Sequence, residues 1–177
     1  MSTERRRQML HVLKDSGAVI PGKKLAEAFN VSRQVIVQDI AILRAQGEDI
    51  IATARGYTCG KEEKSPVIRK RIACCHDANN MRNELLAIVD AGCCVRDVIV
   101  EHSLYGELQG LLLLENKKDV EDFVDRYEQQ GAELLSALTA GVHLHTIEAK
   151  NPRAFKKAES NLRKLDILLE DNKQSSN

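Results

Sequence analysis

SRQVIVQDIAILRAQG, Ser32 to Gly47, is the stretch that decides the fold of the first part of the chain. On a helical wheel Ile36, Ile40 and Leu43 gather on one side, as they do on the core-facing side of an amphipathic helix. Ser32 is a good N-cap, and Gly47 is a suitable C-terminal stop. The stretch therefore predicts one helix that buries a single face.

The segments on both sides of this helix complete a small domain. Thr3–Ser16 and the shorter segment Leu25–Phe29 have apolar residues at helical spacing, and DIIAT (49–53) and GYTC (56–59) are short strand candidates. Three helices followed by a hairpin is the element order of a winged helix-turn-helix. Residues 1–60 are predicted to form such a DNA-binding domain.

A second domain follows the polar, proline-ending segment KEEKSP, residues 61–66, which is typical of a linker. Beyond it, strands and helices alternate in the order β-α-β-β-α-β-α, with the last helix expected over 152–170 after the cap Asn151 and Pro152. This order predicts an α+β open-faced β-sandwich over 67–171, with one sheet and helices on a single face. The polar tail 172–177 is expected to be disordered.

Composition narrows the class of protein. The 177 residues are 43% hydrophobic, enough for a core, and no apolar run is long enough to span a membrane. With no apolar signal segment at the start, this predicts a cytoplasmic protein. The chain has five cysteines, four of which form two pairs of sequence neighbours, and this pattern does not predict a disulfide framework. Residues 1–60 carry nine Lys and Arg against six Asp and Glu, a weak hint of a polyanionic partner.

The face of the Ser32–Gly47 helix opposite its apolar side suits the DNA major groove. Glutamine can pair with adenine, alanines allow a close approach, and a serine hydroxyl can meet phosphate. The alternative is an ordinary solvated helix face. Arg55, at the hairpin tip, is either a minor-groove or phosphate contact or an exposed loop arginine. The predicted DNA-binding residues are Ser32, Arg33, Gln34, Gln38, Arg44 and Arg55.

Two histidines, His143 and His145, occupy alternate positions of the strand expected over 142–148, so their side chains point to the same face. His76 ends the first strand of this domain, and Glu84 follows eight residues later on a helix. If these strands lie close together, three ring nitrogens and one carboxylate can converge on a metal ion. The alternative is that they are ordinary polar positions.

Three other residues are weaker candidates. His102, at the end of another strand, is either a ligand or a turn histidine bonded to the backbone, and Tyr105 is either a binding-loop aromatic or a residue packed over the sheet edge. Cys74 shares strand parity with His76, and it is either a ligand for a thiophilic metal or a small buried residue. We assign no role to His11. Phosphate-binding glycine loops and the GxSxG and HExxH motifs are missing from the sequence.

Four blocks, in this order, resemble the niacin-responsive transcriptional repressors, which have a winged helix and a 3H domain: SRQVIVQDIAILRA, DIIATARGY, VEHSLYGE and LTAGVHLHTI. The resemblance covers about Arg5 to Ile147. It implies a repressor of genes for niacin uptake or NAD synthesis, with nicotinic acid as co-repressor. It also implies an HPr-like second domain and a homodimer.

The resemblance also implies a metal site at His76, Glu84, His143 and His145, the same residues that the spacing suggests, and an effector-binding role for His102 and Tyr105. The chain departs from the family pattern at Ser103, where proline is usual, and at Cys93, Cys94 and Ala140, where glycine is expected. Ser103 could loosen the turn that holds His102 and so weaken effector binding.

The metal is expected to be Ni²⁺, Zn²⁺ or Fe²⁺. Three His and one Glu on a tetrahedral zinc leave no open position, whereas five- or six-coordinate Ni²⁺ or Fe²⁺ can also accept an effector carboxylate. A homodimer predicts a palindromic operator in double-stranded DNA. Two alternatives stand beside this hypothesis: a small metallohydrolase, for which Asp77 is the only candidate base, and a constitutive DNA-binding dimer indifferent to niacin.

Overall fold

The computed structural model describes residues 2–60 and 66–170, and the chain divides into two compact units, Met1–Ser65 and Pro66–Asn177. Each unit is described by itself. Residues 61–65 of the expected linker and the tail expected over 172–177 lie outside the described residues.

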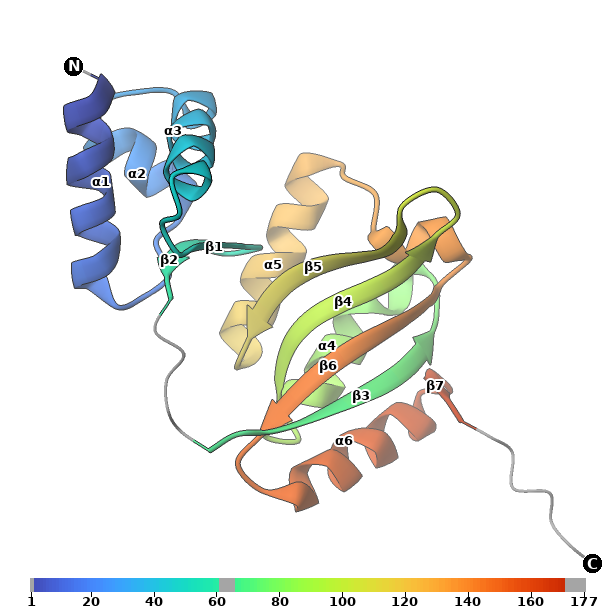
Figure 1. Cartoon of the computed structure of the whole chain (residues 1–177). Helices are drawn as coiled ribbons and strands as arrows, with labels where there is room; N and C mark the ends of the chain where they lie inside the picture. The colour runs from blue at the N-terminus through green and yellow to red at the C-terminus, as the bar shows by residue number, and fades with distance from the viewer. Residues whose placement is uncertain (1, 61–65, 171–177) are drawn as a thin grey trace, which may run out of the picture. The chain divides into compact units, whose positions relative to one another are not determined.

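The first unit consists of three helices and a hairpin (Figure 1). Its elements are α1 (Ser2–Ser16), α2 (Gly22–Ala28), α3 (Arg33–Ala45), β1 (Ile50–Thr53) and β2 (Gly56–Cys59). Its core consists of Met9, Leu13, Leu25, Ala26, Ile36, Ile40, Leu43 and Ile50. The Ser32 hydroxyl accepts a hydrogen bond from the Val35 backbone N–H at 3.3 Å, which confirms the predicted cap of α3.

The hairpin is fastened to the helices through its second strand. Ile20, between α1 and α2, pairs with Tyr57 by two backbone hydrogen bonds of 2.8 and 2.9 Å. Gly56 makes this approach possible, because its φ is +142° and a Cβ there would lie 2.2 Å from the Ile20 carbonyl oxygen. The hairpin is therefore a wing with a fixed base.

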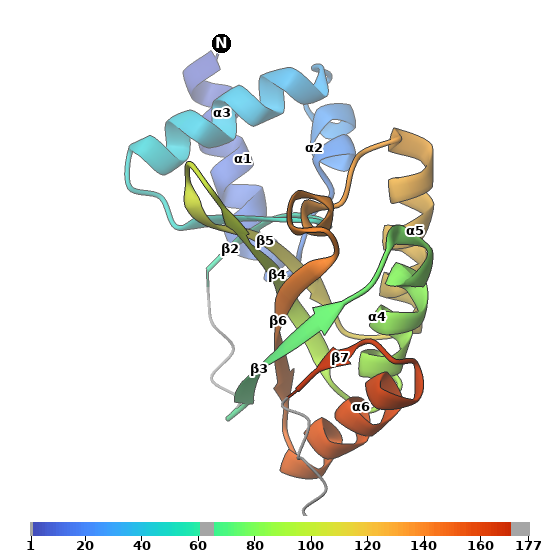
Figure 2. The ribbon, with the colours of Figure 1, turned by 90° about the vertical axis from the view of Figure 1, so that its right-hand side faces the viewer.

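The second unit is one five-stranded sheet with helices on one of its faces. Its elements are β3 (Ile68–Cys75), the 3-10 turn η1 (Ala78–Asn80), α4 (Met81–Val89), β4 (Cys94–His102), β5 (Gly106–Leu114), α5 (Lys117–Gln130), the 3-10 turn η2 (Leu135–Thr139), β6 (Val142–Ala149), α6 (Pro152–Lys164) and β7 (Leu168–Leu169). The strand order is β5-β4-β6-β3-β7, and every pair of neighbours is antiparallel. Figure 2 shows α4, α5 and α6 on the same side of the sheet, as the element order predicted.

Alternation along the central strand β6 separates the core from the open face. Its odd-numbered residues His143, His145, Ile147 and Ala149 are buried, and the residues between them are at least partly accessible. Asn151 caps α6 by accepting a hydrogen bond from the Arg153 backbone N–H at 2.9 Å, which confirms the predicted start of that helix. The two histidines consequently lie inside the unit, between sheet and helices.

The helix expected over 152–170 is too long. In the structure α6 ends at Lys164, the chain turns at Asp166 with a φ of +57°, and β7 then pairs with β3. Ile167 is 2% exposed, and its carbonyl oxygen accepts a hydrogen bond from the Cys75 backbone N–H at 2.9 Å. Burial of Ile167 and pairing of the free edge of β3 offset the cost of a left-handed aspartate.

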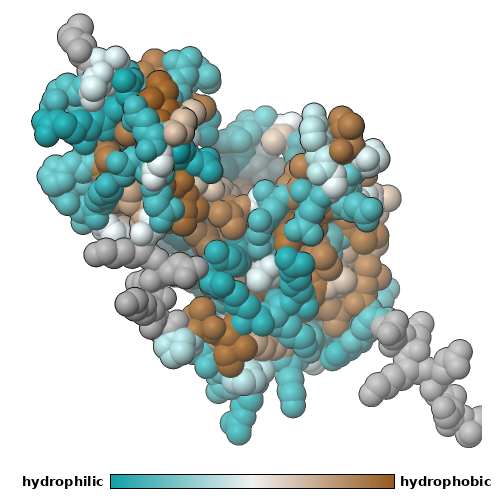
Figure 3. Space-filling view, viewed as in Figure 1, coloured by the Kyte–Doolittle hydropathy of each residue, from teal (hydrophilic) through white to brown (hydrophobic). Residues whose placement is uncertain are grey.

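Among the described residues, no helix is long and apolar enough to cross a membrane. Figure 3 shows hydrophilic residues over much of the face of the first unit turned to the viewer.

Candidate metal centre and nucleic-acid interface

The structure brings His76, Glu84, His143 and His145 together in the second unit. Glu84, on α4, lies with its carboxylate among the three rings. Its Oε2 is 2.7 Å from His76 Nε2 and 3.3 Å from His145 Nε2, and its Oε1 is 2.9 Å from His143 Nε2. All four side chains are at most 3% exposed. The convergence that strand parity could not establish is thus present.

Each of the three rings is oriented through its other nitrogen. The Nδ1 atoms of His76, His143 and His145 lie 2.6, 2.8 and 2.5 Å from the backbone carbonyl oxygens of Asp77, Gly141 and Asp97. A carbonyl oxygen can only accept, so each Nδ1 carries the hydrogen and donates it. In the neutral rings this tautomer leaves three Nε2 lone pairs aimed at Glu84, the arrangement that metal-ligating histidines adopt.

A carboxylate and three lone pairs cannot satisfy one another without a cation. His145 Nε2 is near Glu84, but the approach lacks hydrogen-bond geometry, so this buried atom has no hydrogen-bond partner. An unsatisfied buried nitrogen costs about 1–3 kcal/mol. Protons can supply positive charge to some of these contacts, whereas one divalent ion can satisfy all the lone pairs and the carboxylate together. The donor set therefore fits a transition metal.

The electrostatics of the cluster point in the same direction. Burial opposes the charged form of His145, but the negative charge of Glu84 outweighs it and the pKa of His145 is raised. The pKa of His76 is raised by the same balance of burial against the Glu84 carboxylate. Burial acts to raise the pKa of Glu84, yet the three histidines hold it well below its ordinary value. The pocket thus keeps a buried carboxylate ionised and attracts positive charge.

Sheet register explains why distant segments meet here. β3 pairs with β6 so that Cys74 lies opposite His143 and Ile72 opposite His145. His76 follows directly on β3, and the close approach of its carbonyl oxygen to Gly141 requires glycine, since a Cβ at 141 would lie 2.4 Å from that oxygen. Three ligand positions are therefore fixed by one antiparallel pair of strands.

Sequence reasoning missed Asp97, which supports this cluster from β4. The ladder between β4 and β6 shifts register between Val95 and Ile99, so β4 contains one extra residue. The Asp97 carboxylate accepts hydrogen bonds from the Thr146 backbone N–H at 2.8 Å and from the Gln109 amide at 2.7 Å. The signal was available: an acidic residue among the otherwise apolar inward-facing positions of a strand.

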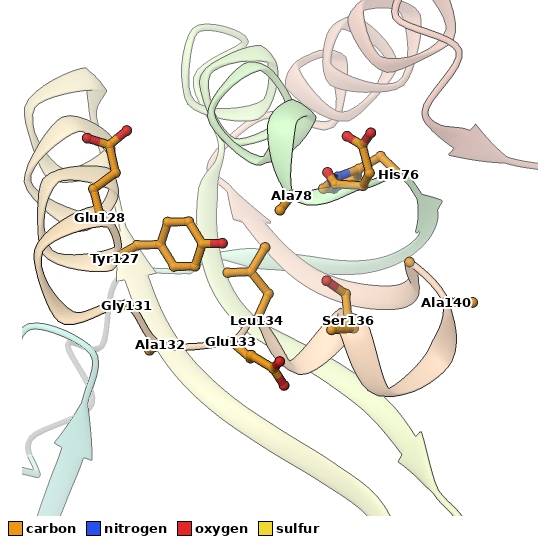
Figure 4. Close-up of a pocket in the computed structure, with 13 residues that line it drawn as sticks. His76, Ala78, Tyr127, Glu128, Gly131, Ala132, Glu133, Leu134, Ser136 and Ala140 are labelled. Atoms are coloured by element: carbon orange, nitrogen blue, oxygen red, sulfur yellow. Dashed lines mark hydrogen bonds between the residues drawn. The ribbon is translucent and has the colours of Figure 1, made fainter.

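A cavity of about 690 Å³ opens beside His76, between α5 and η2 (Figure 4). In Figure 4 the ring of Tyr127 projects from α5 toward Leu134. Three carboxylates lie in the lining, and no lysine or arginine is among the described lining residues. The lining residues are His76, Asp77, Ala78, Tyr127, Glu128, Gly131, Ala132, Glu133, Leu134, Ser136, Ala137, Ala140 and Gly141.

The structure does not bring His102 and Tyr105 to this cluster or to this cavity. His102 ends β4, and its Nδ1 accepts hydrogen bonds from the backbone N–H groups of Leu104 and Tyr105 at 3.1 and 3.2 Å. These hydrogen bonds match the alternative interpretation of His102, a turn histidine bonded to the backbone. Tyr105 is 71% exposed in the β4–β5 turn.

The first unit presents the polar face of α3 to solvent. Arg33, Gln34, Gln38 and Arg44 are exposed, while Asp39 on the inner face is buried. Asp39 pairs with Arg5 and Arg6 of α1 at 2.6 and 3.3 Å, so it ties α1 to α3. Ser32 is exposed at the helix start, and Arg55 lies half-buried in the turn of the wing.

Asp77, the only candidate general base for the metallohydrolase alternative, has a structural role. Its Oδ1 accepts hydrogen bonds from the Asn79 backbone N–H at 3.1 Å and from the Asn80 side chain at 3.4 Å, where it caps η1. A carboxylate used as a cap is poorly placed to accept a proton from water.

Comparison with known proteins agrees with both units. An HTH domain model matches residues 5–58, and a 3H domain model matches residues 69–171. The chain is 39% identical over 173 residues to "Transcription repressor NadR" of Bacillus subtilis (strain 168), which covers 97% of this chain and 96% of that protein. It is also 39% identical over 168 residues to "Probable transcription repressor NiaR" of Thermotoga maritima, which covers 95% of each.

Both relatives are named as transcription repressors, a class of DNA-binding proteins that are not enzymes. The helix-turn-helix of the first unit and the α+β architecture of the second are those of the matched domains. The chain therefore belongs to the 3H-domain family and, within it, to the NiaR-like transcription repressors.

Proposed function

We propose that the chain is a cytoplasmic repressor of genes for niacin uptake or NAD synthesis, with nicotinic acid as co-repressor beside a metal ion in the second unit. The observation that carries the metal is the buried cluster, in which three oriented imidazoles face one carboxylate and His145 Nε2 has no partner. The choice of effector rests on the sequence resemblance.

The residues proposed to hold the ion are His76, Glu84, His143 and His145, and the candidate ions are Ni²⁺, Zn²⁺ and Fe²⁺. The carbonyl oxygens of Asp77, Gly141 and Asp97 keep each ring turned inward and, in the neutral ring, hold the hydrogen on Nδ1, so that Nε2 is the nitrogen that would meet the ion. These hydrogen bonds orient the rings before an ion binds, and so they lower the entropy that the ligands would lose on binding.

The cavity beside His76 is the proposed effector site. Nicotinate is an anion, and Asp77, Glu128 and Glu133 in the lining disfavour it electrostatically. When bound, a divalent ion would supply positive charge and an open position for a carboxylate oxygen. The lining residues would then enclose the pyridine ring, so we expect nicotinic acid to need the metal and nicotinamide, which has no carboxylate, to bind poorly.

One set of operator-binding measurements tests this function. Fluorescence anisotropy with labelled operator DNA is measured for protein with and without bound metal, and with nicotinic acid, nicotinamide or neither. We expect tight binding only with metal and nicotinic acid, because a ligand shifts an equilibrium only if it binds the two states differently. Operator affinity indifferent to both niacin and chelator would instead indicate the constitutive DNA-binding dimer.

DNA contact is proposed through Ser32, Arg33, Gln34, Gln38, Arg44 and Arg55. α3 would enter the major groove, and the wing that carries Arg55 would meet the minor groove or the backbone. A homodimer would read a palindromic operator with half-sites separated by whole helical turns. Footprinting of the operator and light scattering of the protein check both statements.

The effector role of His102 and Tyr105, which are not among the residues that line the cavity, stays a prediction. His102→Ala and Tyr105→Phe should lower nicotinic acid affinity if these residues contact it. Tyr127→Phe is the matched variant inside the cavity.

A further inference from the structure

Cys74 is the buried residue whose chemistry the proposed metal centre leaves unused. It is 0% exposed and lies on β3 directly opposite His143, so its side chain points to the same inner face of the sheet. Cys75, the next residue, is partly exposed and lies opposite Val142. Among the cysteines of the described residues, Cys74 is the one next to the cluster.

The sulfur belongs to a compact group of potential ligand atoms. Cys74 Sγ, a carboxylate oxygen of Glu84 and a ring nitrogen of His143 all lie within 4.8 Å of one another. The Cys74 thiol lies beside the Glu84 carboxylate. Ligand atoms around one ion, with bonds of about 2.0–2.3 Å, are separated by up to about twice that length. The sulfur therefore needs only a small adjustment to reach an ion held by Glu84 and His143.

A second observation, independent of the cysteine, marks this spot as a place for a cation. His145 Nε2 is buried, has no hydrogen-bond partner and lies 3.3 Å from Glu84, the carboxylate beside the Cys74 thiol. A thiol that only filled space would face apolar side chains. This thiol faces an ionised group that already attracts positive charge.

We infer that Cys74 is a further ligand of the metal centre and that its sulfur biases the site toward thiophilic ions. The inference rests on the proposed metal-binding function. The sulfur would bind as thiolate, with its proton passing to the buffer. A soft sulfur beside imidazoles favours Zn²⁺, Co²⁺ and Ni²⁺ over Mn²⁺ and Mg²⁺, which prefer oxygen ligands. With Cys74 the site offers five protein ligands, which would fill a five-coordinate Zn²⁺ and leave one position for an effector carboxylate on a six-coordinate Ni²⁺.

Cobalt reports on sulfur ligation directly. The full chain, stripped of metal under reducing conditions, is loaded with one equivalent of Co²⁺, and the absorption spectrum is recorded. We expect a near-ultraviolet sulfur-to-cobalt charge-transfer band in the wild type, in Cys75→Ala and in Cys93→Ala. The band should be absent in Cys74→Ser and Cys74→Ala. Zn²⁺ affinity should fall by about tenfold or more in Cys74→Ala and stay unchanged in Cys75→Ala.

The outcomes separate this inference from the function on which it rests. If wild-type protein binds no Co²⁺ and no Zn²⁺, the metal centre itself is wrong. If it binds cobalt but its spectrum lacks the sulfur band, or Cys74→Ala keeps the band, the metal centre stands and the role of Cys74 is wrong. X-ray absorption of the zinc-loaded wild type covers the case of a variant that does not fold: a sulfur neighbour at about 2.3 Å is expected, and a shell of nitrogen and oxygen alone contradicts the inference.

Discussion

Gly141 holds two of the proposed ligands with its backbone alone. Its carbonyl oxygen accepts hydrogen bonds from the His76 backbone N–H at 3.3 Å and from the His143 ring at 2.8 Å. Its φ is +93°, and a Cβ would lie 2.4 Å from the His76 carbonyl oxygen, which is backbone and cannot swing away. The position accepts glycine alone because space and conformation both exclude a side chain.

Gly141→Ala should therefore weaken metal binding through two ligands at once. We expect Zn²⁺ affinity to fall by more than about tenfold in competition titrations, and the second unit to lose at least about 2 kcal/mol of stability in urea unfolding. Gly131→Ala is the matched control. Gly131 has a φ of +58° with nothing within 4 Å of the added Cβ, so this variant should lose about 1 kcal/mol and keep its metal affinity. Equal metal affinity in the two variants would show that Gly141 does not position the ligands.

Residue patterns pointed to the four candidate ligands but could not predict that their side chains lie together. His143 and His145 share a face because of the two-residue period of a strand, which is a local property. That Glu84 on α4 reaches them depends on β3 pairing with β6 and on α4 packing over that pair, which no local pattern contains. The resemblance to a known family supplied that information instead.

At the scale of elements, the extra residue in β4 is a device that orients His145. It turns the Asp97 carbonyl oxygen toward the His145 ring and places the Asp97 carboxylate against the Thr146 backbone N–H. Asp97→Ala removes this acceptor. We expect a loss of about 1–3 kcal/mol in urea unfolding and a lower Zn²⁺ affinity, because the bulge loses the hydrogen bond to Thr146 that holds it in place.

Asp97→Asn is the informative comparison, because its amide oxygen can still accept the Thr146 hydrogen bond. Metal affinity should return most of the way to that of the wild type. Asp90→Ala, at an exposed position at the end of α4, should change neither stability nor metal binding. If Asp97→Ala binds zinc as the wild type does, the extra residue of β4 has no part in orienting the ligand.

The end of α6 shows why element boundaries escaped the sequence. Leu165, Ile167, Leu168 and Leu169 continue an apolar pattern that a helix could bury, so the helix was expected to run to 170. In the structure Ile167 is instead buried in the core, and Leu168 pairs with the free edge of β3. The competition between continued helix and edge strand is decided by tertiary contacts, whereas the starts of α3 and α6 were predictable because caps are local.

On α3, substitutions should distinguish a residue that contacts a base from one that contacts a phosphate. Gln38→Ala should weaken operator binding by about 1–3 kcal/mol and leave binding to unrelated DNA nearly unchanged, since a base contact carries sequence information. Arg33→Ala should weaken both and reduce the slope of log affinity against log salt by about one. Anisotropy titrations at several salt concentrations measure both quantities. If Gln38→Ala loses the same affinity for operator as for unrelated DNA, the proposed base contact of Gln38 is wrong.

At the scale of the whole molecule, the proposed binding of nicotinic acid and the binding of DNA would be linked by one coupling free energy. If nicotinic acid raises operator affinity by some factor, operator DNA must raise nicotinic acid affinity by the same factor. We expect the two ratios to be equal when they are measured on metal-loaded protein, one by operator titration and the other by calorimetry with nicotinic acid. Each should lie between about 5 and 150. Glu84→Gln keeps the size of the side chain and removes its charge, and it leaves the first unit unaltered. This variant should bind operator with the affinity of effector-free protein, and both ratios should fall to one. Coupling that persists in Glu84→Gln would place the sensor elsewhere in the chain than at the cluster around Glu84.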